Sequence, residues 1–156
     1  MSRPPRAPRV QSRQAALQAL YAVDVARRGA EEPLEPLAVE EALAELAAHF
    51  ELPEGAREYA RELAVGVARH RDAIDAQLVA HSTNWRIERM AVVDRNVLRL
   101  AIYEMGWLGL PPSVAIDEAV ELARRFGADP SPAFVNGVLD AVAHSFAGRA
   151  RAWETT

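Results

Sequence analysis

Apolar residues recur at helical spacing along most of the chain, and this periodicity constrains the fold more than any other feature. The widest apolar face lies in the segment 86–107 and consists of Met90, Val93, Val97, Leu98, Ala101, Ile102 and Met105. Apolar positions at i, i+3, i+4 and i+7 indicate an amphipathic helix. No segment alternates apolar and polar residues over the length of a strand. The sequence therefore predicts an all-α fold in which 86–107 is the central helix.

The other predicted helices are separated by turns rich in glycine, proline and acidic residues. They run from Gln11 or Ser12 to about residue 28, then over about 37–50, over about 53–81 with a break near His70, from Ser113 to the residue before Gly127, and through Val135 to Phe146. This pattern predicts one compact bundle of six or seven helices over residues 11–147. A flexible basic arm (1–10) precedes it and a flexible tail (148–156) follows.

Three residues near the last two helices have predicted structural roles. Ser113 is expected to cap the N-terminus of its helix, because serine side chains accept hydrogen bonds from the first backbone amides. Gly127 is expected to end that helix in the left-handed conformation. Gly137 falls inside a helical pattern, so it is expected to permit a close approach between helices.

Charge is distributed unevenly along the chain. Residues 1–28 contain six arginines and one acid, a formal charge of +5, which leaves −9 for the rest of a chain with net charge −4. Such a split suggests a basic arm for an anionic partner. All eighteen basic residues are arginine. A GC-rich genome explains this bias, although arginine also suits phosphate binding and base stacking better than lysine does.

The sequence lacks the usual signatures of an enzyme. It has no cysteine, and none of its four histidines is spaced as a zinc-binding pair. It contains neither a phosphate-binding glycine-rich loop nor a nucleophile elbow. We therefore expect no catalytic site, metal or cofactor. No apolar run is long enough to span a bilayer and no secretory signal is visible, so the chain is expected in the cytoplasm.

The front of the chain offers groups suited to an anionic partner that also carries flat rings, as a single-stranded nucleic acid does. Arg6, Arg9 and Arg13 lie on the arm and the first helical turns, where they could contact phosphates. Tyr21 follows two turns after Arg13 and could provide a ring for base stacking. The alternatives are a solvated tail for the arginines and a core or rim position for Tyr21.

Two further groups are candidates for RNA contacts. Arg95 and Arg99 recur at i, i+4 and form a short basic track, although pairing with acids of the same helix (Glu88, Asp94 or Glu104) explains them equally well. Phe126 and Phe134 bracket the turn between the last two helices. They could stack on bases, but such residues usually lie in the core of a helical bundle.

Several motifs together resemble one family. The central helix contains Arg95-Asn96-Val97-Leu98-Arg99-Leu100-Ala101-Ile102-Tyr103-Glu104-Met105. It is followed by Val114-Ala115-Ile116-Asp117-Glu118-Ala119-Val120-Glu121-Leu122-Ala123, by Phe126-Gly127 and by Phe134-Val135-Asn136-Gly137-Val138-Leu139-Asp140. Arg13 followed by Ala16-Leu17-Gln18-Ala19-Leu20-Tyr21 completes the pattern. Their order and spacing resemble the NusB family over about residues 9–146, and Gln18 joins the predicted RNA-binding set.

The chain departs from the family pattern in two places. Asp117 stands where the family usually has asparagine, which is expected to affect helix capping. Val10, Gln11 and Ser12 separate Arg9 from Arg13, so the arginine cluster is thinner than in the family.

The resemblance implies a function. NusB proteins bind the boxA element of ribosomal RNA leader transcripts together with NusE, a ribosomal protein of the small subunit, and join elongating RNA polymerase to suppress termination. We therefore expect single-stranded boxA-like RNA, NusE and the polymerase complex as partners, and no membrane. The alternative is a helical protein-interaction module whose acidic body docks a basic partner and whose arm binds no specific RNA.

Overall fold

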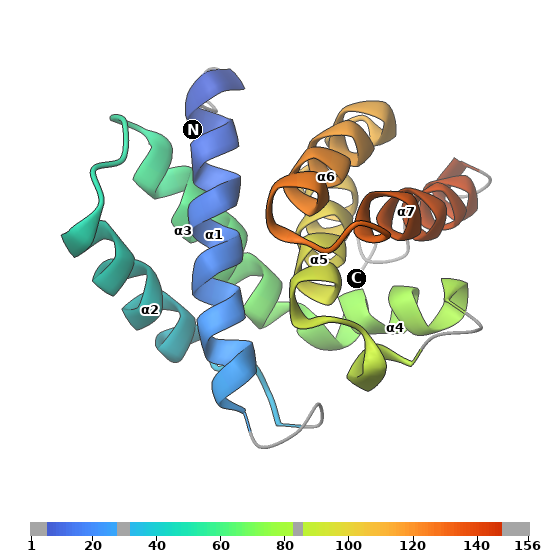
Figure 1. Ribbon diagram of the computed structural model, residues 1–156, viewed down its shortest axis with the longest axis horizontal. Coiled ribbons are helices and arrows are strands. Elements are labelled where there is room, and N and C mark those ends of the chain that lie inside the picture. The colour runs from blue at the N-terminus through green and yellow to red at the C-terminus, as the bar shows by residue number, and fades with distance from the viewer. Residues whose placement is uncertain (1–5, 28–31, 83–85, 148–156) are drawn as a thin grey trace. The chain divides into compact units, whose positions relative to one another are not determined.

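The computed structural model describes residues 6–27, 32–82 and 86–147, and all its regular elements are helices (Figure 1). These elements are α1 (Arg6–Ala26), α2 (Pro36–His49), α3 (Ala56–Arg69), α4 (Arg71–His81), the short 3-10 helix η1 (Ile87–Arg89), α5 (Val92–Gly106), α6 (Pro112–Phe126) and α7 (Ser131–Ala147). The predicted all-α fold is confirmed. The sequence predicts one bundle, and the structure groups the helices into two compact units, unit 1 (Met1–Arg71) and unit 2 (Asp72–Thr156).

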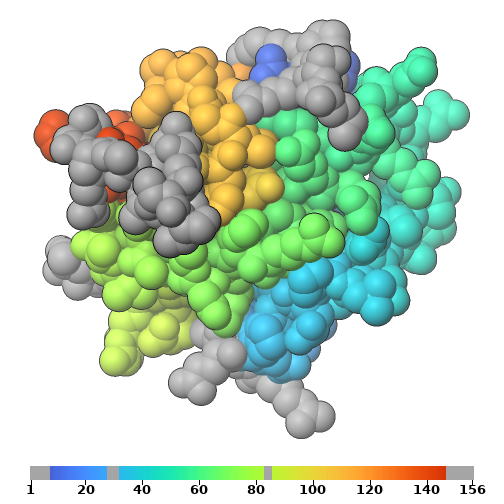
Figure 2. Space-filling model, turned by 180° about the vertical axis from the view of Figure 1, so that it is seen from behind, coloured from blue at the N-terminus to red at the C-terminus, as the bar shows by residue number. Residues whose placement is uncertain are grey.

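Unit 1 is built on three helices that all pack against one another: α1 on α2, α1 on α3 and α2 on α3. Figure 2 shows the side chains of α2, in cyan, directly beside those of α3, in blue-green. A buried cluster joins the three helices, and its members are Ala15, Ala19, Leu43 and Ala60, with Ala42, Leu46 and Leu52 packed against it. Alanines dominate this cluster, so the helix backbones can approach closely.

Unit 2 is centred on α5, which packs against both α6 and α7, while α6 and α7 pack against each other. Every residue of α5 from Arg95 to Gly106 is buried. The sequence predicts a central helix packed on several sides, and the structure confirms this.

Two helices begin at positions that differ from the predicted ones. α1 begins at Arg6, so residues 6–10 are helical although the sequence analysis assigns them to the flexible arm. Pro8 is compatible with this start, because the first turn of a helix needs no intrahelical N–H bonds. α5 begins only at Val92, since Met90 and Ala91 are extended and separate it from η1. Residues 1–5 and the predicted tail (148–156) lie outside the described residues.

The predicted break near His70 is confirmed: α3 ends at Arg69 and α4 begins at Arg71. The predicted cap at Ser113 is wrong. Pro111 occupies the N-cap and Pro112 the first turn of α6, because the fixed φ of proline already suits a first helical position.

The predicted end of α6 at Gly127 is confirmed, but the left-handed conformation predicted there and the close helix approach predicted at Gly137 are wrong. Gly127 has φ −96° and ψ −177°, an extended conformation. It is nevertheless restricted to glycine, since an added Cβ would lie 2.7 Å from Ser131 Oγ and 2.8 Å from the Ala123 carbonyl oxygen. Gly137 is exposed, and a Cβ added there would meet nothing within 4 Å. The close contact that requires a glycine is therefore at Gly127, in the turn between α6 and α7, and not at Gly137 within α7.

No helix among the described residues is long and apolar enough to cross a membrane.

Candidate nucleic-acid interface

The predicted RNA-binding residues fall into both units. Arg6, Arg9, Arg13, Gln18 and Tyr21 lie on α1, Arg95 and Arg99 on α5, Phe126 at the end of α6, and Phe134 on α7.

One face of α1 presents polar side chains to solvent. Gln11, Gln18 and Tyr21 are exposed and Gln14 is half-buried. Their spacings of three and four residues place them on one side of the helix. Tyr21 is 42% exposed, so its ring is accessible. This face, called the glutamine face below, combines amides that donate and accept hydrogen bonds with an aromatic ring.

The arginines of α1 differ from one another in accessibility. Arg13 is only 3% exposed, so the structure does not support its predicted contact with a phosphate. Arg9 is half-buried, and its Nε is buried without a hydrogen-bond partner. Arg6 begins α1, and its side chain lies outside the described residues.

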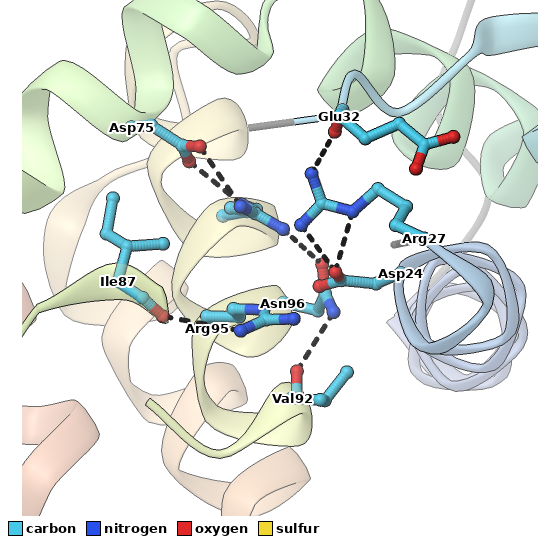
Figure 3. A network of polar contacts seen from close by, with 9 residues as sticks. Asp24, Arg27, Glu32, Asp75, Ile87, Val92, Arg95 and Asn96 are labelled. Carbon is cyan, nitrogen blue, oxygen red and sulfur yellow. Dashed lines mark hydrogen bonds and ion pairs between the residues drawn. The ribbon is translucent and has the colours of Figure 1, made fainter. Parts of the chain in front are cut away.

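Polar contacts near both ends hold α1 in place within unit 1. Near its start, Ser12 is fully buried, and its hydroxyl lies 2.9 Å from the Pro8 carbonyl and 2.7 Å from the Ala56 carbonyl at the beginning of α3. At its end, Arg27 Nε donates to Asp24 Oδ1 at 3.0 Å, and Arg27 Nη1 donates to the Glu32 carbonyl (Figure 3). The ends of the glutamine face are thus anchored to the rest of the unit.

A pocket of about 210 Å³ opens beside the glutamine face. Its lining residues come from α1, from the end of α2 and from the segment that follows, and they are Gln11, Gln14, Ala15, Gln18, Leu46, Phe50, Glu51 and Leu52. Among these residues, the sequence predicts a binding role only for Gln18. The spacing of the glutamines on α1 could have indicated a shared polar face from the sequence. The proximity of Phe50 to α1 could not, because it depends on how α1 and α2 pack.

The two α5 arginines are held inside unit 2. Arg99 is 0% exposed; its Nε donates to Asp75 Oδ1 at 2.8 Å and its Nη2 to Asp75 Oδ2 at 3.0 Å. Its Nη1 donates to Asn96 Oδ1 at 3.1 Å, and Asn96 Nδ2 donates to the Val92 carbonyl at 2.9 Å. This is a bidentate ion pair extended by an amide, and it connects α5 to α4.

Arg95 is 8% exposed, and its Nη1 donates to the Ile87 carbonyl at 3.3 Å (Figure 3). Arg95 and Arg99 therefore do not form a solvent-exposed basic track. The alternative of ion pairs along the same helix also names the wrong partner for Arg99, because the carboxylate belongs to Asp75 on α4. A residue 24 positions earlier in the chain could not be chosen from helical spacing.

The α6–α7 corner carries both predicted phenylalanines, each half-buried. The guanidinium of Arg125 lies 5.5 Å from the ring centroid of Phe126, within the range of a cation–π contact. The corner is shaped by Ser131, whose Oγ accepts a hydrogen bond from the Ala128 amide at 3.1 Å. Arg125 is exposed and was missed by the sequence analysis, which considered only the rings at this turn.

A model of the NusB family matches residues 10–144 of the sequence. The chain belongs to the NusB family. The transcription antitermination protein NusB of Anaeromyxobacter dehalogenans (strain 2CP-1 / ATCC BAA-258) is 47% identical over 136 residues, which cover 86% of this chain and 89% of that relative.

Two solved structures extend the similarity to the fold. NusB of T. maritima matches with a TM-score of 0.72 and 36% identity, covering 92% of this chain and 93% of that one. A chain in a crystal structure of the antitermination factors NusB and NusE in complex with dsRNA matches with a TM-score of 0.73 and 27% identity, covering 90% of this chain and 99% of that one.

Membership of the NusB family confirms the resemblance inferred from the motifs. The expected effect of Asp117 on helix capping is not borne out by its position, because Asp117 is exposed within α6 and Pro111 occupies the N-cap. Within the described residues, no group of three or more His, Asp or Glu side chains is arranged to hold a metal ion.

Proposed function

We propose that this chain is a transcription antitermination factor. In this role it binds boxA-type single-stranded RNA of ribosomal RNA leader transcripts together with NusE, joins the elongating RNA polymerase complex and prevents premature termination. Family membership supports the proposal, as do the name of the 47% identical relative and the structural neighbour that contains NusE and RNA.

The observation that carries the proposal is the glutamine face of α1. Gln18 and Tyr21 are both exposed and lie three residues apart, so an amide and a ring point to the same side. Stacking on a ring and hydrogen bonds to base edges are the means by which proteins read unpaired nucleotides. Both residues belong to the predicted RNA-binding set.

The same face favours a single strand over a duplex. Bases of an RNA duplex are stacked on each other, and their edges in the deep, narrow major groove are out of reach of side chains. Tyr21 can stack only on a base that has left such a stack. The structural neighbour was solved with dsRNA, so the choice between strand forms needs a direct test.

Fewer of the predicted arginines are accessible to phosphates than the sequence suggests, because Arg13, Arg95 and Arg99 are buried. If Arg6 and Arg9 supply them, the slope of log K against log salt is about −1.4, since each contact with a single strand contributes about −0.7. Four such contacts would instead give a slope near −3.

The experiment is a titration of labelled RNA with the full chain, with and without NusE, at two salt concentrations. The RNAs are a boxA-like strand of about 12 nucleotides, a scrambled strand and a duplex of the boxA-like sequence. We expect preferential, salt-sensitive binding to the boxA-like strand that tightens with NusE. No binding to any RNA, even with NusE, would overturn the proposal in favour of a protein-docking module.

A pair of variants on α1 locates the interface. Tyr21→Ala should weaken binding about tenfold, the loss expected for one stacked base. Val25→Ala is the matched control, because Val25 is also exposed on α1 (53%) but offers neither a ring nor an amide. Val25 lies four residues after Tyr21 on the same side of α1, so equal losses for both variants would overturn the stacking role of the Tyr21 ring.

A further inference from the structure

The pocket beside the glutamine face has an apolar side and a polar side. Ala15, Leu46 and Leu52 supply the apolar side, and the same three residues belong to or pack against the buried cluster of unit 1. Because these residues are held by the core, the pocket is largely preformed. A ligand that enters it therefore need not organise it, which favours affinity.

Phe50 lines the pocket and is unusually exposed for a phenylalanine, at 62%. Its position is not that of a freely moving loop residue, since it is the C-cap of α2 and its amide donates to the Leu46 carbonyl at 3.0 Å. An exposed aromatic ring on an anchored backbone is a platform for another flat group.

The polar side of the pocket consists of amides and one carboxylate. Gln11, Gln14 and Gln18 approach from α1, and Glu51 follows Phe50. No arginine lines the pocket, and the negative charge of Glu51 repels phosphate, so the pocket favours a base over the RNA backbone. A neutral base with hydrogen-bond donors on its edge suits these groups, because a carboxylate only accepts hydrogen bonds.

We infer that this pocket binds one unpaired RNA base with an exocyclic amino group, stacked on Phe50 and read by the glutamines and Glu51. The volume of about 210 Å³ is below the roughly 300–1,000 Å³ of pockets for larger ligands, so it suits one planar ring system. The inference rests on the proposed RNA-binding function and adds a specificity pocket, contributed by α2, to the glutamine face of α1.

The test uses the full chain with NusE and the boxA-like strand, in which the fluorescent base 2-aminopurine replaces each position in turn. Stacking on an aromatic ring quenches 2-aminopurine. We expect strong quenching when 2-aminopurine occupies one position of the strand. Phe50→Ala should abolish this quenching and bind the RNA about tenfold more weakly. Phe50→Tyr, which keeps an aromatic ring, should retain the quenching. Uracil at that position should also weaken binding, and Glu51→Gln should reduce the discrimination against uracil.

Leu37→Ala is the matched control variant. Leu37 is a large apolar residue of α2 that is as exposed as Phe50 (66%), but it does not line the pocket. It should therefore leave both the quenching and the affinity unchanged. Circular dichroism checks that each variant folds, which is expected because the replaced side chains are exposed.

The outcomes separate this inference from the proposed function. If Phe50→Ala binds and quenches like the original chain while Tyr21→Ala weakens binding, the pocket inference falls and RNA binding stands. If the original chain binds no RNA, both fall. If Phe50→Ala weakens the binding of NusE in the absence of RNA, the pocket holds a protein segment, and the assignment of a base is overturned.

Discussion

Helices α1 and α5 both carry arginines and a tyrosine, and their two tyrosines lie in opposite environments. Each helix has arginines at helical spacing and a tyrosine in its second half. On α1, Tyr21 is 42% exposed and lies on the glutamine face. On α5, Tyr103 is 8% exposed and stacks on Trp107 with ring centroids 5.9 Å apart, while Arg95 and Arg99 are buried.

The difference teaches what helical spacing can and cannot establish. Residues at i and i+4 share a face of a helix whatever surrounds that helix. Whether the face meets solvent depends on the neighbouring elements, which sequence spacing does not specify. For α5 the neighbours are α6, α7 and the Asp75 carboxylate of α4. Polar residues at helical spacing therefore form a solvent-exposed face on α1 and an internal ion-pair network on α5.

The largest expected effect on stability is that of Arg99→Ala. Removing Arg99 takes the bidentate partner from the Asp75 carboxylate, and breaking a buried ion pair in this way costs about 3 kcal/mol in the free energy of unfolding. The lower end of the usual range applies, because 14% of the Asp75 side chain is exposed. Urea denaturation followed by circular dichroism measures the change.

Arg86→Ala is the control for Arg99→Ala. The Arg86 side chain is 71% exposed and its Nε lies 3.7 Å from Glu88, so its loss should change stability by less than about 0.5 kcal/mol. If Arg99→Ala were as stable as the original chain but bound RNA weakly, Arg99 would act in RNA binding and not in stability, which would contradict the contrast drawn between α1 and α5.

The second effect concerns the corner that positions Phe126 and Phe134. Gly127→Ala should destabilise the protein by about 2 kcal/mol, because the new Cβ overlaps Ser131 and the backbone oxygen of Ala123. Gly137→Ala should instead stabilise it by up to about 1 kcal/mol, since alanine favours a helix interior and has open space there. Thermal unfolding of the pair tests this, and equal shifts would contradict the assigned close approach.

A smaller effect is expected within α1 itself. Ser12→Ala removes the hydroxyl that lies 2.7 Å from the Ala56 carbonyl and should cost about 1 kcal/mol. Ser145→Ala, on α7, removes a local bond to the Val142 carbonyl in a partly buried position and should cost less. A Ser12→Ala protein with unchanged stability would show that this contact does not anchor α1.

The smallest stability change should come from the glutamine face. Gln18→Ala should alter the free energy of unfolding by less than about 0.5 kcal/mol, because the side chain is exposed. Its RNA affinity should nevertheless fall, since base-edge hydrogen bonds are lost. Paired denaturation and RNA titration measure both quantities, and a loss of stability without a loss of affinity would reverse the comparison between α1 and α5.

For the residues chosen from the sequence, the structure shows accessibility, and their role in RNA binding stays a prediction. Gln18 and Tyr21 are exposed on α1, as an RNA contact requires. Arg13, Arg95 and Arg99 were chosen by charge and spacing, and all three are buried. Phe50 was not chosen, because nothing in its local sequence distinguishes a ring beside α1 from one in any loop.

The sequence by itself determined the helices, the break at His70 and membership of the NusB family, because period, helix breakers and motif order are local properties of the chain. Tertiary structure alone decided which helix faces meet solvent, which carboxylate pairs with Arg99 and which residues form the pocket with Phe50. Each of these depends on contacts between residues distant in the chain, and local spacing carries no information about such contacts.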